Sequence, residues 1–428
     1  MKNKIAYLFS SETLARRFPF YYGWVMMPVV VIAQSLTGVG QTYGVSVFNP
    51  SFQSSLDISL SQLTGAYMIG TLLAAVPQSY IGSLMDRFGI RRVMTVVVVG
   101  LGLACIFISR VNSLAALLIG FFLLRMLGQG SLSLLSGNIP PMWFREKLGM
   151  VTGFVNGGVS LSQAVVPPLF LAMIQARGWR WTYAALGVGV WVIMLPILGV
   201  LFRNRPDDVG QQVDGEKSAG EVRLEKPVNE NRSMDPGQAR RTPAYWIALL
   251  NTSLWAMIVT AVFFNILPIL TSQGVSDSAA AATFTTYAAA SLVSQLLAGL
   301  LADRLPLQFL LVFCMASLMS SVGVLSIAVS PLLAQTYALL IGISAGGISV
   351  LGGTLWARYY GPQHLGKLRG GVITAMVAGS SVGPFITGVI FDLTGSYQYS
   401  IWLFGFLLLP AAVASFWARN PLKAGYEG

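Results

Sequence analysis

Apolar segments long enough to cross a lipid bilayer recur along the whole of this 428-residue chain. Each spans about 20 residues, the length that an α-helix needs to cross the hydrocarbon core of a membrane. Only 10% of the residues are charged, whereas a soluble domain carries about a quarter. Because lipid offers no partner to an unpaired backbone amide, these segments must be helical. The sequence therefore predicts an all-α membrane protein.

Twelve such segments can be traced, and a polar connector divides them six from six. We expect transmembrane helices at roughly 21–48, 60–84, 92–110, 114–140, 150–174, 181–202, 243–270, 279–302, 307–329, 332–356, 370–391 and 399–418. The expected organisation is a cytoplasmic N-terminal segment at 1–20, an N-terminal six-helix bundle at 21–202, a cytoplasmic linker at 203–242, a C-terminal six-helix bundle at 243–418 and a cytoplasmic tail at 419–428.

The connector from Arg203 to Arg241 contains as many acidic as basic residues, few apolar ones and several Gly and Pro. A segment of this composition buries too little apolar surface to fold alone, so we expect it to be mostly disordered or weakly amphipathic. A plain linker is the expected role, and a regulatory docking segment is the alternative.

The distribution of Lys and Arg predicts the orientation of the chain in the membrane. With the N-terminus inside, cytoplasmic segments hold all but four of the 27 basic residues, the exceptions being Arg110, Arg125, Arg177 and Arg180. Basic residues concentrate on the cytoplasmic side of membrane proteins, so both termini are predicted to be cytoplasmic. The net charge of +11 is spread over short connectors, which argues against nucleic acid as a partner.

One short motif occurs twice, about half a chain apart. Gly82-Ser-Leu-Met-Asp86-Arg87 closes the second apolar segment, and Gly299-Leu-Leu-Ala-Asp303-Arg304 closes the eighth. Both have the pattern G-x-x-x-D-R. A membrane chain that repeats its architecture in two halves points to a transporter with a central site between them.

These residues resemble the major facilitator superfamily. The run Gly82 to Arg92 is similar to the family signature between helices 2 and 3, and Gly299 to Arg304 is similar to its degenerate copy between helices 8 and 9. The resemblance covers essentially the whole chain. It implies two pseudo-symmetric six-helix bundles, and a secondary active or facilitative transporter that works by rocker-type alternating access. We expect a monomer, and no enzyme, because no metal cluster, nucleophile–base pair or paired carboxylates appear within the spans.

Four further segments resemble one branch of that superfamily, the bacterial carriers related to monocarboxylate and oxalate/formate transporters. They are Phe20–Met26, Tyr43–Phe48, Trp143–Gly149 and Asp392–Tyr397. This resemblance implies a multi-pass protein of the bacterial inner membrane with a small organic anion as its substrate.

The charges of the motif predict a conformational latch on the cytoplasmic side. Asp86 can accept hydrogen bonds from amides at a helix N-terminus, or pair with Arg91 or Arg92, and Gly82 can admit a neighbouring helix. The alternative is that these charges only mark a positive-inside loop. The expected latch residues are Gly82, Asp86, Arg87, Arg91 and Arg92, with Asp303 and Arg304 as the counterpart in the second half.

Arg125 is the one charged residue predicted near the middle of a span, and no Asp or Glu occupies such a position. A charge at that depth costs several kcal/mol unless it faces water or a partner, so Arg125 is a candidate substrate-binding residue. A guanidinium suits a carboxylate because its planar fork forms two parallel hydrogen bonds. The alternative is that Arg125 holds helices together through their carbonyls and side-chain amides.

Other polar or aromatic residues at similar depth are candidates for the same cavity. In the superfamily, helices 1, 4, 7 and 10 line the cavity and helices 5, 8 and 11 contribute at its margins. The candidates are Gln34, Gln41, Asn156, Asn251, Trp255, Tyr287 and Gln295. Related carriers typically place a second cation in helix 8 and a lysine in helix 11, where this chain has Gln295 and Met376. A dicarboxylate is therefore disfavoured.

No metal-ligating cluster, cofactor motif or nucleotide-binding P-loop is visible, so we expect no cofactor and no ATP-driven transport. Three coupling schemes remain: anion exchange, facilitated diffusion, and cotransport in which a proton arrives with the substrate. Export of a drug or hydrophobic metabolite is the alternative function within transport. A transport-inactive receptor or assembly protein of the same fold is the alternative outside it.

Overall fold

The computed structural model of the protein describes residues 20–215, 234–361 and 365–424. The predicted N-terminal segment at 1–20, except Phe20, the middle of the connector and the end of the tail lie outside these residues. The described part consists of helices and short turns, with no strand. It contains eleven helices that are long and apolar enough to cross a membrane, and a bent pair that gives a twelfth. The predicted all-α membrane fold is confirmed.

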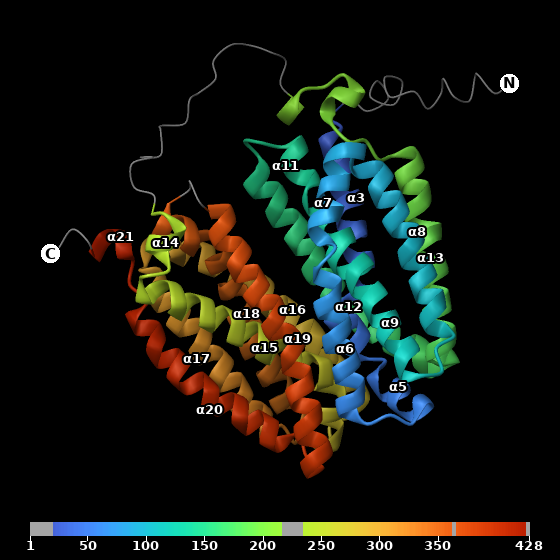
Figure 1. Ribbon diagram of the computed structural model, residues 1–428, viewed down its shortest axis with the longest axis vertical. Coiled ribbons are helices and arrows are strands. Elements are labelled where there is room, and N and C mark those ends of the chain that lie inside the picture. The colour runs from blue at the N-terminus through green and yellow to red at the C-terminus, as the bar shows by residue number, and fades with distance from the viewer. Residues whose placement is uncertain (1–19, 216–233, 362–364, 425–428) are drawn as a thin grey trace. The chain divides into compact units, whose positions relative to one another are not determined.

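Figure 1 shows the elements from the first half of the chain and labels most of the longer helices. They are α3 (Gly23–Leu36), η1 (Thr37–Gly40), α4 (Thr42–Ser46), α5 (Asn49–Leu56), α6 (Leu60–Ala75), α7 (Gln78–Phe88), α8 (Ile90–Ser109), α9 (Leu114–Leu124), η2 (Arg125–Leu132), α10 (Ser133–Gly137), α11 (Ile139–Trp143), α12 (Leu148–Arg177), α13 (Trp179–Val200), η3 (Pro206–Val209) and η4 (Val213–Gly215).

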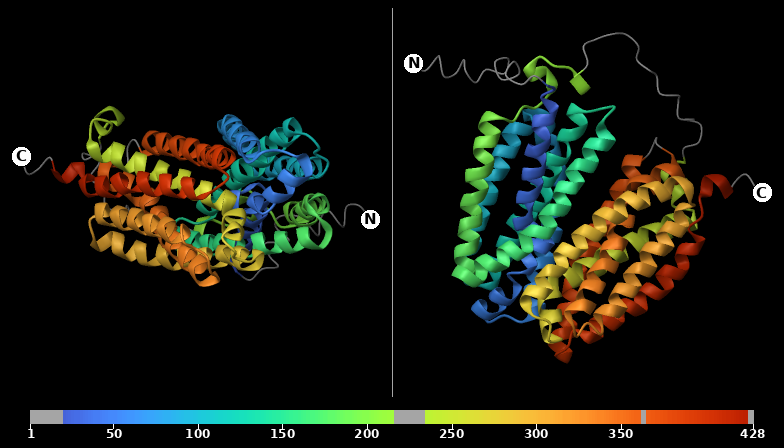
Figure 2. Two further views of the ribbon diagram at one scale, coloured as in Figure 1. Left: turned by 90° about the horizontal axis from the view of Figure 1, so that it is seen from below. Right: turned by 180° about the vertical axis from the view of Figure 1, so that it is seen from behind.

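The elements of the second half are drawn in yellow-green to red in Figure 2. They are α14 (Pro236–Ala239), α15 (Pro243–Ser272), α16 (Asp277–Arg304), α17 (Leu307–Leu325), α18 (Pro331–Tyr360), α19 (Leu365–Thr394), α20 (Gln398–Ala414), η6 (Ser415–Trp417) and α21 (Pro421–Ala424).

Several predicted spans are interrupted rather than continuous. The span expected at 21–48 consists of α3, the 3-10 turn η1 and α4, and the one expected at 114–140 contains the π-helical segment η2. The span expected at 60–84 is divided between α6 and α7, where Pro77 caps α7. A proline lacks the backbone donor that an unbroken helix needs at that point.

The described residues form two compact units. The first contains residues 20–45, 73–162 and 172–215, and the second contains 46–72, 163–171, 234–361 and 365–424. Segments 46–72 and 163–171 come from the first half of the chain but pack in the second unit. The predicted six-helix bundles at 21–202 and 243–418 stay a prediction.

Close helix packing through glycine organises the first unit. On α8 and α13, a Cβ added to Gly102 would overlap the Trp191 indole, and one added to Gly187 would lie 2.7 Å from the Gly102 carbonyl oxygen. The Trp191 indole also donates to the Val99 carbonyl oxygen over 3.1 Å. Small residues at a membrane helix interface let the backbones approach, which explains the pairing of α8 with α13.

The same device pairs α16 with α18 in the second unit. A Cβ on Gly342 would lie 2.6 Å from the Tyr287 carbonyl oxygen, and one on Gly346 would lie 2.6 Å from the Gln295 amide nitrogen. The two helices are therefore held at a separation that no larger side chain would allow.

The start of the connector, residues 203–215, is held by specific contacts, whereas much of the segment expected to be mostly disordered or weakly amphipathic lies outside the described residues. The carboxylate of Asp214 accepts hydrogen bonds from the backbone amides of Arg145 and Glu146, both 2.9 Å long. The side chain of Gln211 accepts from the Tyr22 amide over 2.9 Å. These hydrogen bonds connect the segment to the beginning of α3 and to the turn before α12. They position residues 203–215, and amino-acid composition alone does not reveal such contacts.

Candidate functional site

Arg125 lies at the first residue of the π-helical segment η2 in the first unit, and only 4% of it is exposed. Its Nη1 atom donates to the carbonyl oxygen of Gly40 and to Oγ1 of Thr42, each over 3.4 Å. Both acceptors are neutral oxygens. π-Helical turns inside α-helices occur frequently at functional sites, because the extra residue alters where a side chain points.

Two glycines bring Arg125 to these acceptors. A Cβ on Gly40 would overlap the carbonyl oxygen of Leu124, and one on Gly128 would lie 3.2 Å from Cα of Gly40. The backbones of η1 and η2 therefore touch. The carbonyl that Arg125 contacts is at the C-terminal end of η1, where the partial negative charge of a helix end favours a cation.

Two predicted glutamines gather beside this crossing. Nε2 of Gln34 donates to the carbonyl oxygen of Ser133 over 3.4 Å. Nε2 of Gln41 lies 3.3 Å from Oγ1 of Thr37 and 3.5 Å from Oγ of Ser133. Gln34, Gln41 and Ser133 are all half-buried. The structure thus brings Gln34 and Gln41 together on Ser133, at the junction of η2 and α10.

The other predicted residue of the first unit is Asn156, which is half-buried in α12. The remaining four lie in the second unit, and three of them form hydrogen bonds between helices. Asn251, 2% exposed, donates to Oγ of Ser415 over 2.7 Å. The bond joins α15 to η6, and a substrate-binding role for Asn251 stays a prediction.

The indole of Trp255 donates to Oγ of Ser344 over 3.1 Å, and Nε2 of Gln295 donates to Oγ of Ser349 over 2.9 Å. The ring of Tyr287 packs edge-on against Phe263, with the centroids 4.6 Å apart. These three side chains are half-buried, so each retains some exposed surface beyond its contact.

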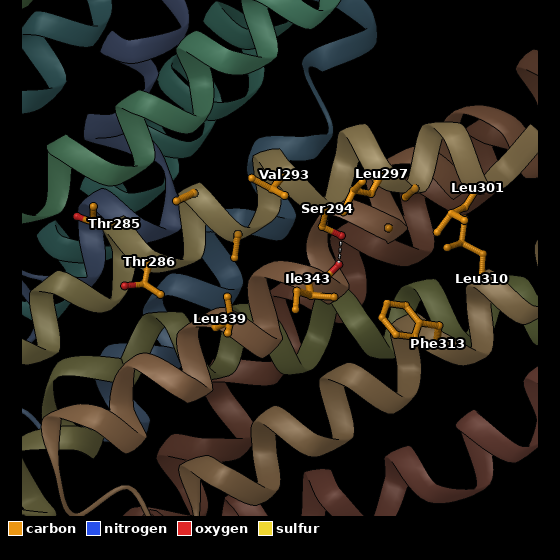
Figure 3. A pocket seen from close by; sticks show the side chains of 14 residues that line it. Thr285, Thr286, Val293, Ser294, Leu297, Leu301, Leu310, Phe313, Leu339 and Ile343 are labelled. Atoms are coloured by element: carbon orange, nitrogen blue, oxygen red, sulfur yellow. Dashed lines mark hydrogen bonds between the residues drawn. The ribbon is translucent and has the colours of Figure 1, made fainter.

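Sequence reasoning missed an apolar groove of about 650 Å³ on the second unit, between α16, α17 and α18 (Figure 3). None of the eight predicted substrate residues lines it. The hydroxyl of Ser294 is drawn donating to the carbonyl oxygen of Ile343, a 2.7 Å bond. A signal was present in the apolar stripe of α16, in which Val293, Leu297 and Leu301 recur every fourth residue.

Arg91, one of the predicted latch residues, contacts the end of α13 within the first unit, and the latch itself stays a prediction. Nε of Arg91 donates to the Leu198 carbonyl oxygen over 2.8 Å, and Nη2 donates to that of Gly199 over 2.6 Å. The backbone amide of Arg91 also donates a hydrogen bond, 2.9 Å long, to Oδ1 of Asn204. A cation at the last carbonyls of a helix is favoured by the helix dipole, so Arg91 fastens α8 to the end of α13.

The other latch candidates differ in their surroundings. The guanidinium of Arg87 lies over the Phe88 ring, 5.1 Å from its centroid, while Arg92 and Arg304 are exposed. A Cβ on Gly82 would meet no atom within 4 Å, so the close helix approach expected there is not found among the described residues. The side chains of Asp86 and Asp303 lie outside the part of the chain that the structure describes.

Comparison with known proteins places the chain and its fold in a family. Residues 30–334 and 256–427 match the family model described as the Major Facilitator Superfamily. The fold is also similar to the crystal structure of a bacterial homologue of the human lysosomal transporter Spinster, with a TM-score of 0.70 and 16% identity. That match covers 94% of this chain and 98% of the other.

Curated relatives include the branch expected from the sequence. A probable L-galactonate transporter of Escherichia coli is 24% identical, over 89% of this chain and 86% of its own. Monocarboxylate transporter 10 of Mus musculus is 25% identical, over 90% and 76%. An oxalate:formate antiporter of Oxalobacter formigenes is 23% identical, over 58% and 54%. The resemblance to the monocarboxylate and oxalate/formate branch is thereby confirmed.

Proposed function

This chain belongs to the Major Facilitator Superfamily, and from that premise we propose that it carries a small organic anion, of the monocarboxylate class, by rocker-type alternating access. The proposed location is the bacterial inner membrane, with both termini in the cytoplasm. The observation that carries the proposal is the guanidinium of Arg125, fixed in a buried position where η1 crosses η2.

Charge at this position favours an anion over a cation. A buried guanidinium attracts a carboxylate strongly in a medium of low dielectric constant and repels cationic solutes. Gly40 and Thr42 contribute neutral oxygens, which orient Arg125 without adding negative charge. Gln34 and Gln41 are near the same crossing and supply amide donors for the remaining oxygens of an anion.

The solutes of two relatives agree with a carboxylate substrate. L-galactonate, oxalate and formate are named as solutes of proteins to which this chain is similar, and all three are carboxylates. Because the helix 8 position has Gln295, which donates to Ser349, the second cation that a dicarboxylate requires is missing from that position. A monocarboxylate therefore fits better than a dicarboxylate.

Transport in reconstituted liposomes tests the proposal directly. We expect uptake of labelled lactate, pyruvate, formate or galactonate, and a raised melting temperature of the purified protein with the same solute, because a ligand stabilises the folded state that binds it. Dependence on a proton gradient or on an internal counter-anion would separate symport from exchange. Flux of none of these anions, with no stabilisation by any of them, would remove the anion class.

A second candidate is export of a hydrophobic or amphipathic solute, and one observation favours it. The groove of about 650 Å³ between α16, α17 and α18 is lined almost entirely by apolar side chains. Resistance profiling of an overexpressing strain tests this function. Solute flux of either kind by the purified protein would exclude the third candidate, a receptor or assembly protein without transport activity.

A further inference from the structure

The N-terminus of α6 is capped partly from within its own turn. The backbone amide of Ser59 donates to Oε1 of Gln62 over 3.0 Å, and the amide of Gln62 donates to Oγ of Ser59 over 3.2 Å. This reciprocal pair is a capping box, which satisfies two groups that the start of a helix leaves without intrahelical partners. The amides of Leu60 and Ser61 still need acceptors.

Asp392, near the C-terminal end of α19, provides those acceptors. Its Oδ1 accepts from the Leu60 amide over 3.2 Å, and its Oδ2 accepts from the Ser61 amide over 2.8 Å. The carboxylate thus caps a helix that lies more than 300 residues earlier in the sequence. Hydrogen bonds from amides to a charged acceptor are stronger than neutral ones, and the helix dipole favours the negative charge there.

The backbones fit closely one turn further along both helices. A Cβ added to Gly388 would overlap Oγ1 of Thr64 and lie 2.9 Å from the Leu60 carbonyl oxygen. A Cβ on Gly65 would lie 3.4 Å from the Phe385 ring. Asp392 therefore closes a contact that extends over about two turns of helix. We call Leu60, Ser61, Thr64, Gly388 and Asp392 the α6–α19 joint.

A second contact ties the same part of the first half to α15. Asn49, at the start of α5 and 1% exposed, donates through its side-chain amide to the Phe264 carbonyl oxygen. The rings of Tyr67 and Phe264 pack with their centroids 4.3 Å apart. The α6–α19 joint therefore belongs to a set of specific contacts between α5, α6 and two helices of the second half.

The helix that the joint holds belongs to both compact units. Residues 60–72 of α6 lie in the second unit, and residues 73–75 lie in the first. We propose that Asp392 is a releasable helix cap, and that the α6–α19 joint is a latch that holds one end of the transporter shut. The end of α6 would leave Asp392 when that end opens. The predicted orientation places this end on the periplasmic side.

The chemistry of the joint suits repeated opening. When α6 leaves Asp392, water can take over both the carboxylate and the freed amides, so the net cost of breaking the bonds stays small. Ser59 and Gln62 keep the helix start capped in either state. The inference rests on the alternating access proposed above, but it does not depend on the anionic substrate.

Thiol accessibility tests the latch. Thr64 is 0% exposed, so Thr64→Cys reports on opening when the purified protein reacts with a polar maleimide in detergent. The native Cys105 and Cys314 are buried, and the parent chain measures their background. Asp392→Asn should raise the labelling rate of Thr64→Cys about tenfold, which is the shift expected from losing one charge-assisted hydrogen bond.

A matched control distinguishes the latch from a general loss of negative charge at helix starts. Asp277 lies exposed in the first turn of α16, so Asp277→Asn should leave the rate unchanged. Ser61→Pro removes the Ser61 donor while keeping Asp392, at a first-turn position that tolerates proline. It should raise the rate as well, and the double variant should label no faster than the faster single variant.

An unchanged rate in folded Asp392→Asn, or an equal increase in Asp277→Asn, would overturn the latch. If Asp392→Asn fails to give a monodisperse protein, Ser61→Pro decides alone. Because labelling needs no solute, a protein that carries no anion and still shows the increase would refute the proposed function and leave the latch standing.

Discussion

Arg125 donates from Nη1 to the carbonyl oxygen of Gly40, a residue that has no side chain because the next helix passes against it. The same close approach therefore positions the guanidinium and selects glycine. The proposed substrate recognition and the helix packing involve the same pair of residues. Separate variants of Arg125 and Gly40 are therefore needed to test the two roles.

Replacement of Arg125 tests the role of its charge. Arg125→Gln should abolish anion transport while leaving a folded monomer, and Arg125→Lys should retain little, because an ammonium group cannot form the two parallel hydrogen bonds of a guanidinium. Arg110→Gln, an exposed arginine at the end of α8, is the control and should transport normally. Normal transport by Arg125→Gln would make Arg125 a structural residue and remove the basis of the anion proposal.

Gly40→Ala tests the close packing of Gly40 against Leu124. Its Cβ would overlap the Leu124 carbonyl oxygen, and forcing an extra methyl group into a packed interface costs about 1–3 kcal/mol. The melting temperature should fall. Gly153→Ala in α12 is the matched control, because a Cβ there meets nothing within 4 Å and alanine is the better helix former. Equal melting temperatures for the two variants would contradict the close crossing of η1 and η2.

Arg91 and Arg92 are adjacent arginines with different surroundings. Arg91→Ala removes two hydrogen bonds to the end of α13 and should lower the stability by about 1–3 kcal/mol. Arg92→Ala removes an exposed charge and should change it by less than about 0.5 kcal/mol. Thermal unfolding of the purified variants measures both values, and a larger effect at Arg92 would reverse the assignment.

Asp86 remains the predicted centre of the cytoplasmic latch. Asp86→Asn removes the charge while keeping the side-chain volume, so it should slow cycling or shift the resting conformation without changing which solute is carried. The turnover rate and the solute selectivity, measured in the same liposomes, check this separately. Unchanged turnover would leave the charge as a marker of loop topology.

The ordered start of the connector is tested at Asp214. Asp214→Ala frees the amides of Arg145 and Glu146, so the segment should become more sensitive to limited proteolysis. Asp207→Ala, an exposed acidic residue of η3, should leave the cleavage rate unchanged. Identical cleavage of Asp214→Ala and the unaltered protein would show that other contacts are enough to hold the segment.

The sequence could predict the positions of the membrane-spanning helices, because the lipid environment determines them. Helix positions follow from hydropathy because each span has to satisfy its own backbone in the bilayer. Interruptions within spans were missed: Thr37–Gly40 is apolar enough to continue a helix, but it forms a 3-10 turn whose Gly40 lies against Leu124. Hydropathy averages over such local changes of hydrogen bonding.

The candidate site was predictable in part, for a related reason. Arg125 is conspicuous as a charge among apolar neighbours. Gln34 in α3 and Gln41 at the end of η1 both contact Ser133, which directly follows the η2 segment that Arg125 begins. Asn251 could not be separated from them in the sequence, although it bonds to Ser415. Asp392 belongs to a motif identified in the sequence, but the sequence assigned it no role. Its carboxylate caps a helix that lies more than 300 residues earlier in the chain, and sequence patterns do not reveal such a contact.

The contacts of Gln211 and Asp214 make residues 203–215 an extension of the first unit instead of a spacer. The effective tether between the halves is therefore shorter than the distance in sequence between α13 and α15 suggests. A fluorescent protein or an affinity tag is therefore better inserted beyond Gly215, since an insertion between Gln211 and Asp214 would disturb their contacts with Tyr22 and with the turn before α12.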